Sequence, residues 1–214
     1  MAAKLCFAVT LFLYPFTFQR GEGSGMELSC YNSYYEIRLE TLWENYEKIL
    51  RFTVPARVIP VLKANAYGMG TSEMAQMLVD ICHCPILACA QVYEGLAIRQ
   101  SGVVTPDILI IGPVLEQAMP HAVRWDLQIP VFTVEGALAL AREAKRQGKR
   151  TRAQIKLETG LNRIGIHPGE ELEQLIQTLK QLSSLEICGA FTHFAQAEDR
   201  GDSFTQEQFR RFQL

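Results

Sequence analysis

Lys63 is the residue of this sequence whose surroundings most clearly favour chemistry. It follows the apolar segment 58–62 and is itself followed by small residues, Tyr67 and two glycines. A lysine at the end of a buried strand can lose its hydration shell and become a usable amine nucleophile, as Schiff-base chemistry requires. The structural alternative is a lysine whose stem lies along the strand end while its ammonium stays in water.

Polar residues also gather at the ends of two later apolar segments. Glu158 and Arg163 follow the segment 153–157, and His193 ends the segment 185–193. The carboxyl ends of parallel strands meet at one face of an α/β fold. These side chains are therefore expected to lie near Lys63 and Tyr67 if the apolar segments are parallel strands.

Short apolar segments alternate with amphipathic helical segments along the chain, which is typical of βαβ units and a parallel sheet. Six strands are predicted, at 58–62, 86–90, 107–112, 129–132, 153–157 and 185–193. No glycine-rich nucleotide motif follows a strand, so we favour an α/β (β/α)8 TIM-type barrel over a doubly wound sheet. With about six of eight strands present, the barrel is expected to be incomplete. Capping boxes are predicted at Thr41 with Glu44 and at Thr205 with Gln208, opening the first and last helices.

Composition excludes some classes of partner. The 214 residues carry a net charge of −2, which argues against nucleic acid and against an anionic membrane surface. The six cysteines are irregularly spaced, and Cys82-His83-Cys84 with Cys89 lacks the usual zinc-ligand spacing. We therefore expect small buried cysteines and no metal ion, and a small molecule or another protein as the partner.

Residues 1–25 are interpreted apart from the fold, as an N-terminal extension or a signal-like segment. Their apolar stretch from Leu5 to Phe18 is too short to span a membrane. Residues 26–214 are expected to form the partial barrel domain, because Met26 opens a sequence typical of a cytoplasmic start. Cytoplasmic localisation is expected, with export as the alternative if residues 1–25 are a genuine signal peptide.

Three segments, 61–70, 155–165 and 191–199, together resemble the barrel domain of bacterial alanine racemases in order and spacing. These are pyridoxal-phosphate enzymes of the (β/α)8 type, and the resemblance runs from about Ser33 to the end of the chain. It implies interconversion of L-alanine and D-alanine, which supplies D-alanine for peptidoglycan. It also implies a homodimer in the full-length form.

The resemblance implies a role for five residues. Lys63 would hold the cofactor and act as one of two catalytic bases. Tyr67 would bind the cofactor phosphate, and His193 would pack near the cofactor ring. Arg163 would lie near the phenolic oxygen of the cofactor and bind the substrate carboxylate. Lys156 matches a lysine that is carbamylated in many family members, where it orients that arginine.

The sequence also departs from the family pattern. Met69 stands where family members commonly have a histidine. The second base of the family is a tyrosine of a C-terminal domain, supplied by the partner subunit, and it lies outside this chain. The chain is therefore expected to be inactive alone. Two alternatives stay open: a single-domain pyridoxal-phosphate carrier, and a racemase for serine or another small amino acid.

Overall fold

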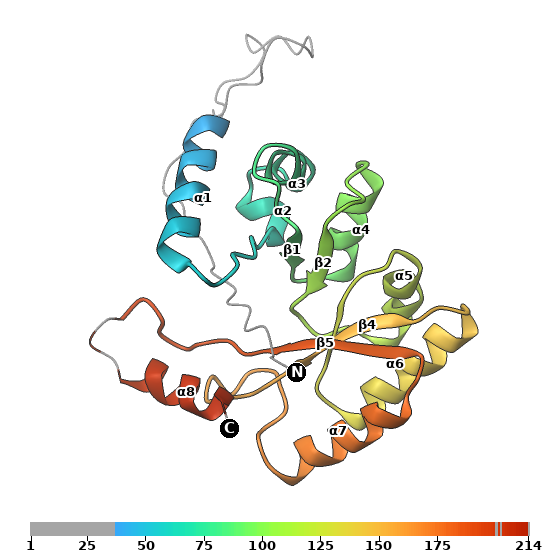
Figure 1. Ribbon diagram of the computed structural model, residues 1–214. Coiled ribbons are helices and arrows are strands. Elements are labelled where there is room, and N and C mark those ends of the chain that lie inside the picture. The colour runs from blue at the N-terminus through green and yellow to red at the C-terminus, as the bar shows by residue number, and fades with distance from the viewer. Residues whose placement is uncertain (1–36, 200, 202, 214) are drawn as a thin grey trace.

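The computed structural model in Figure 1 describes residues 37–199, 201 and 203–213. The expectations for residues 1–25 lie outside these described residues. The helices and strands alternate along the chain as predicted. In order they are α1 (Leu39–Thr53), α2 (Lys63–Tyr67), α3 (Thr71–Asp80), β1 (Ile86–Cys89), α4 (Val92–Gln100), β2 (Asp107–Ile110), η2 (Glu116–Ala118), α5 (Met119–Arg124), β3 (Ile129–Val131), α6 (Val134–Arg146), β4 (Thr151–Lys156), α7 (Glu170–Gln181), β5 (Leu185–Phe191) and α8 (Phe204–Gln213).

All the described strands are parallel. β1 pairs with β2, and β3, β4 and β5 form a second sheet in that order. An isolated parallel bridge between Leu109 and Gln128 connects the two sheets, and a bridge between Val61 and Ala88 adds the segment 58–62. The expected fold, a (β/α)8-type barrel with a partial strand set, is confirmed. The segment 58–62 joins it through a bridge and not through a full strand.

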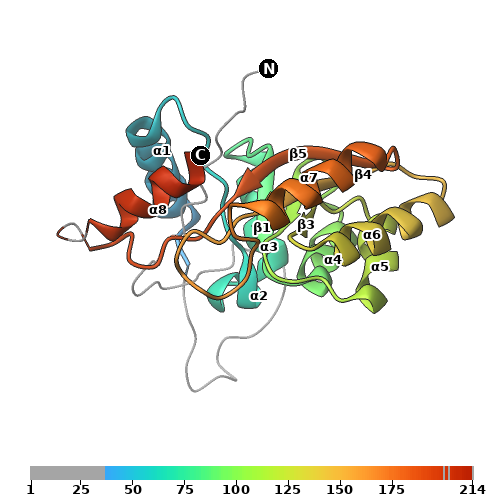
Figure 2. The same ribbon diagram turned by 90° about the horizontal axis from the view of Figure 1, so that it is seen from below.

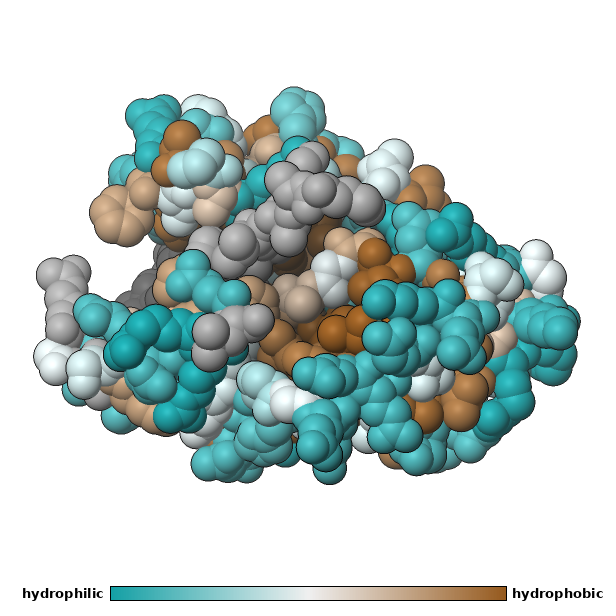
Figure 3. All heavy atoms as spheres, turned by 60° about the horizontal axis from the view of Figure 1, so that its bottom comes forward, coloured by the Kyte–Doolittle hydropathy of each residue, from teal (hydrophilic) through white to brown (hydrophobic). Residues whose placement is uncertain are grey.

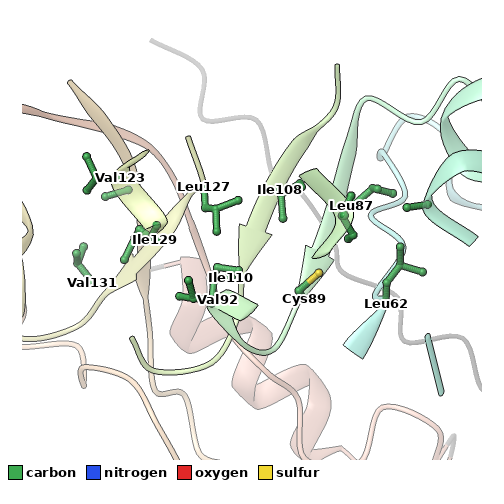
Figure 4. Packing of buried hydrophobic residues seen from close by; sticks show 14 of the residues in the cluster. Leu62, Leu87, Cys89, Val92, Ile108, Ile110, Val123, Leu127, Ile129 and Val131 are labelled. Carbon is green, nitrogen blue, oxygen red and sulfur yellow. The ribbon is translucent and has the colours of Figure 1, made fainter. Parts of the chain in front are cut away.

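The outer side of the strands is covered by helices. Figures 1 and 2 both show α4, α5, α6 and α7 along this side, while α8 lies at the other end beside the loops that follow β4 and β5. Successive strand residues point to opposite faces, so one set meets the helices. Between the strands and the helices lies the large hydrophobic core, part of which Figure 4 shows. Its strand residues include Leu87, Ile108, Ile110 and Ile129.

The inner face of the strands has its own small apolar cluster, made of Ile59, Val61, Ala88 and Leu109. The alternation of β1 and β2 produces it, because Ala88 and Leu109 stand between residues of the outer core. On the surface shown in Figure 3, apolar side chains gather near the centre, and hydrophilic side chains lie below them and to their right.

The two predicted capping boxes do not lie at helix starts. Thr41 and Thr205 stand inside helices that begin earlier, at Leu39 and Phe204. The pattern Ser/Thr-x-x-Glu/Gln also brings two side chains together within a helix, because residues three apart share a face. It therefore cannot by itself locate the first residue of a helix.

Two further expectations meet the structure directly. Cys84 and Cys89 are buried as expected, whereas Cys82 is half-buried and Cys188 is exposed. Within the described part of the chain, every helix is too short or too polar to cross a membrane.

Candidate functional site

The candidate residues lie at the carboxyl ends of parallel strands, as predicted. Lys63 follows the bridge-forming segment 58–62, and Lys156 is the last residue of β4. Arg163 lies in the loop after β4, and His193 lies two residues beyond β5. Parallel pairing places all these ends at the same rim of the partial barrel.

The pKa of His193 shows that the basic side chains of this rim act on its imidazole ring. The protein covers part of its ring, and this desolvation lowers the pKa of His193; the positive charges of Arg163, Lys156 and Lys63 lower it further. The carboxylate of Glu158 opposes the shift. His193 is therefore neutral at pH 7, and four residues of the sequence prediction share one electrostatic environment.

Lys156 is buried on the inner side of β4. Its Nζ donates a hydrogen bond of 2.7 Å to the carbonyl oxygen of Ile111, which follows β2, and lies 5.4 Å from the centre of the Phe191 ring. Burial lowers the pKa of Lys156 to about 8, and the charge of Arg163 adds to the shift while Glu158 opposes it. A substantial fraction of this amine is therefore neutral near physiological pH.

Arg163 is carried by a loop that folds around the buried carboxylate of Glu158. One carboxylate oxygen accepts from the backbone N–H of Gly160 at 2.6 Å, and the other accepts from that of Arg163 at 3.0 Å. The loop closes at Gly165, whose φ of +147° favours glycine. A Cβ there would lie 2.7 Å from the nitrogen of Glu158, so no other residue fits without a shift of the backbone.

The segment that follows Lys63 forms an unusual turn. Ala64, Asn65, Ala66 and Tyr67 all have φ between 51° and 57°, in the left-handed region. The turn places the ring of Tyr67 near the side chain of Lys63, whose Nζ lies 5.7 Å from the ring centre. Desolvation and then the charge of Glu94 raise the pKa of Tyr67, so its hydroxyl stays protonated and can donate.

Gln208 is a residue of the site that sequence reasoning did not identify. It is fully buried on α8, accepts from the backbone N–H of Ala195 at 2.8 Å, and donates to Thr159 Oγ1 and to the carbonyl oxygen of His193, both at 3.2 Å. The Thr159 hydroxyl also bonds that of Thr192 at 2.8 Å. Gln208 thus ties the loop after β4 to the loop after β5. The burial that identifies it is visible only in the structure, because in the sequence the pattern Thr-x-x-Gln predicted a helix cap instead.

Among the residues described, basic side chains gather at this rim, and the carboxylate of Glu158 beside them already accepts hydrogen bonds from backbone N–H groups. Lys63, Arg163 and the protonated fraction of Lys156 supply positive charge, and a small anion is the ligand that such a site favours. Phosphate and carboxylate groups both meet this requirement. An amine, a guanidinium, a neutral imidazole and a phenol are therefore available around a small anionic molecule.

Comparison with known proteins points to one family. Residues 37–214 match the family described as "Alanine racemase, N-terminal domain". The alanine racemase of Methanococcus maripaludis is 33% identical over 178 residues, which cover 83% of this chain and 47% of that protein. The chain thus spans about half the length of the curated relatives that it matches.

Solved structures match a similar share of the chain. An alanine racemase of Clostridium difficile 630, in a complex with cycloserine, superposes with a TM-score of 0.76 at 30% identity, over 82% of this chain and 47% of that one. A histidine racemase of Leuconostoc mesenteroides subsp. sake also superposes with a TM-score of 0.76, at 26% identity, over 82% of this chain and 46% of that one.

Proposed function

The chain belongs to the alanine racemase family, whose N-terminal domain it matches over residues 37–214, and from that premise we propose that it carries the cofactor lysine of a pyridoxal-phosphate-dependent racemase of alanine. The observation that carries the proposal is the placement of Lys63, Lys156, Arg163 and His193 at the carboxyl ends of parallel strands, on one rim of the barrel. Supply of D-alanine for peptidoglycan in the cytoplasm is the proposed role. A homodimer is the proposed form of the full-length enzyme.

The residues present fit pyridoxal phosphate. This cofactor is an anion, and its aldehyde forms a Schiff base with an amine of the protein. When bound, this cofactor supplies an electron-withdrawing ring that makes the α-proton of an amino acid removable. Lys63 would provide the amine, and the phenol of Tyr67 would donate to the phosphate. Arg163 would bind the substrate carboxylate, which a guanidinium does with two parallel hydrogen bonds. His193, being neutral, would pack beside the ring without adding charge.

Proton transfer is the second task of Lys63 in this proposal. Its Nζ would remove or return the α-proton on one face of the substrate, as a general base and then a general acid. Racemisation needs a second such group on the opposite face. We assign that group to the partner subunit in the full-length dimer.

A direct assay tests the proposed function. We expect the full-length protein, loaded with pyridoxal phosphate, to convert L-alanine into D-alanine, as chiral chromatography of the product would show. Serine and histidine belong in the same panel, because a histidine racemase shares this fold at similar identity. Faster turnover of either would reassign the substrate. A protein that holds the cofactor on Lys63 and racemises no amino acid would instead be a carrier.

Lys156 is proposed to be carbamylated. Its neutral amine would attack CO2, forming an N–C bond and releasing one proton, and the resulting anion would pair with Arg163. With a pKa of about 8, roughly half of the amine is neutral at pH 8. At constant dissolved CO2, we expect a carbamate signal in the ¹³C NMR spectrum with labelled bicarbonate, weakening as the pH falls from about 8 to about 6.

Two variants decide the assignment of that signal. Lys156→Ala should lose it, whereas Lys149→Ala should retain it, because Lys149 is exposed and its Nζ donates to the backbone carbonyls of Val123 and Arg124. A signal that survives in the first variant would contradict carbamylation at Lys156.

A further inference from the structure

Glu94 is a buried carboxylate that stands outside the set of residues assigned above. It lies in the first turn of α4 and is 5% exposed. One oxygen, Oε2, accepts from the backbone N–H groups of Ala90 and Gln91 at 2.8 and 2.9 Å. The other oxygen, Oε1, accepts from the backbone N–H of Ala64 at 2.6 Å, thirty residues earlier in the chain.

The start of α4 does not require the contact with Ala64. In a capping box, the glutamate at the third helical position needs only the backbone N–H at the helix start, and Gln91 provides it. Oε1 is therefore left for a second task. The group that it binds is the residue directly after Lys63, at the first step of the left-handed turn.

That turn needs support from its surroundings. Left-handed backbone is unfavourable for residues with a Cβ, and four such residues follow one another from Ala64 to Tyr67. Backbone strain of this kind persists only where contacts with neighbouring groups hold the chain in the strained conformation. Within the turn, the Asn65 side chain accepts from the backbone N–H of Thr71 at 3.0 Å, which closes its far end. Glu94 holds the near end, next to Lys63.

We propose that Glu94 is a positioning residue for Lys63: its carboxylate fastens the left-handed turn to the carboxyl end of β1, so that the lysine amine is presented at the rim of the barrel. This inference rests on the proposed function, in which Lys63 holds the cofactor. Glu94 itself touches no reacting atom in this scheme. Its charge is needed because both of its oxygens must accept hydrogen bonds at once.

Glu94→Gln tests this requirement with little change of shape. An amide has one accepting oxygen, so its NH2 group would face either the N–H of Ala64 or those of Ala90 and Gln91. Thr133→Ala is the matched control. It removes a side-chain cap of similar kind, the 3.0 Å bond from the Gly136 N–H at the start of α6, far from Lys63 in the chain.

Two measurements on the full-length protein separate positioning from general stability. In the cofactor-free protein, amide hydrogen exchange of residues 63–68 should become about tenfold faster in Glu94→Gln and stay unchanged in Thr133→Ala. In the second measurement, pyridoxal phosphate is added and borohydride then reduces the imine, which leaves the cofactor permanently attached to Lys63 as a label. The rate of this labelling should fall by about tenfold or more in Glu94→Gln and stay unchanged in Thr133→Ala.

The outcomes distinguish this inference from the proposed function. If the wild-type protein takes no label on Lys63, the proposed function fails. If the wild type is labelled and Glu94→Gln matches it in both exchange and labelling rate, the positioning role is overturned. Should Glu94→Gln not fold, Glu94→Asp decides, because it keeps the charge at the helix start but is too short to reach both sides. Wild-type exchange at residues 63–68 in that variant would also overturn the role.

Discussion

Lys63→Ala in the full-length protein is expected to abolish covalent attachment of pyridoxal phosphate and with it the visible absorbance of the bound cofactor. Loss of a positioned general base alone lowers a rate by at least about 10²-fold, and the rate of alanine racemisation should fall by more than this. The loss should be larger than for a general base alone, because in the proposed function the same substitution also removes the amine that would hold the cofactor. Absorbance spectroscopy and chiral analysis of the product measure the two effects separately.

A second substitution at the same position tests whether charge is sufficient. Lys63→Arg keeps a cation at the rim, but a guanidinium stays protonated and is a poor nucleophile, so this variant should also lack the covalent cofactor. Lys48→Ala is the control, since Lys48 is an exposed lysine of α1 that pairs only weakly with Glu44 at 3.9 Å. Retention of the cofactor absorbance in Lys63→Ala would show that another lysine holds it.

Glu158→Gln is expected to have the second largest effect, on stability and catalysis together. Its two oxygens accept from the backbone N–H groups of Gly160 and Arg163, and the side chain is buried. An amide would turn an NH2 group toward one of these donors, which should cost roughly 2–3 kcal/mol, as for buried hydrogen bonds to a charged group. Arg163 would then be misplaced, and KM for alanine should rise. Denaturant unfolding and steady-state kinetics measure these effects.

The stabilisation by Glu158 should also depend on pH. Burial would raise the pKa of this carboxyl, but four backbone N–H groups, from Gly160, Asn162, Arg163 and Leu161, outweigh burial and lower it. Because the folded-state pKa is lower than the unfolded-state value, the stabilisation is complete above the unfolded pKa and is lost as the pH falls through the folded pKa.

The wild type and Glu158→Gln should therefore converge in stability as the solution is acidified below about pH 4, near the unfolded pKa of a glutamate. Glu170→Gln, at an exposed position in the first turn of α7, should follow the wild type throughout. A stability difference between wild type and Glu158→Gln that stays constant with pH would show that the carboxylate charge is not the stabilising element.

Much of the site could be predicted because its residues are tied to strand ends. An apolar segment of five or six residues between helical segments identifies a buried strand, and parallel strands direct their carboxyl ends to one rim. Lys63, Arg163 and His193 each lie at or near such an end, so their placement at one rim followed from the local pattern, whereas Lys156 was identified only by the family resemblance. The family resemblance then assigned the chemistry, which spacing could not have done.

Residues that act through distant contacts could not be predicted in this way. Glu94 reads as a helix-start glutamate, and its bond to Ala64 spans thirty residues. Gln208 was interpreted as a helix cap, and it instead joins two loops that carry Arg163 and His193. Neither partner is visible in a local window, because the pairing depends on how helices pack against strand ends.

The sequence by itself therefore determined the order of strands and helices, the partial barrel that they form, and the rim at which Lys63, Arg163 and His193 lie. The alternation of apolar and amphipathic segments predicts the strands and helices, and parallel pairing then places the carboxyl ends of the strands at one rim. Only the tertiary structure decided the left-handed turn after Lys63 and the carboxylates that support the site, Glu94 and Glu158. A strained backbone of non-glycine residues exists only where buried partners hold it, and those partners come together only when the chain has folded.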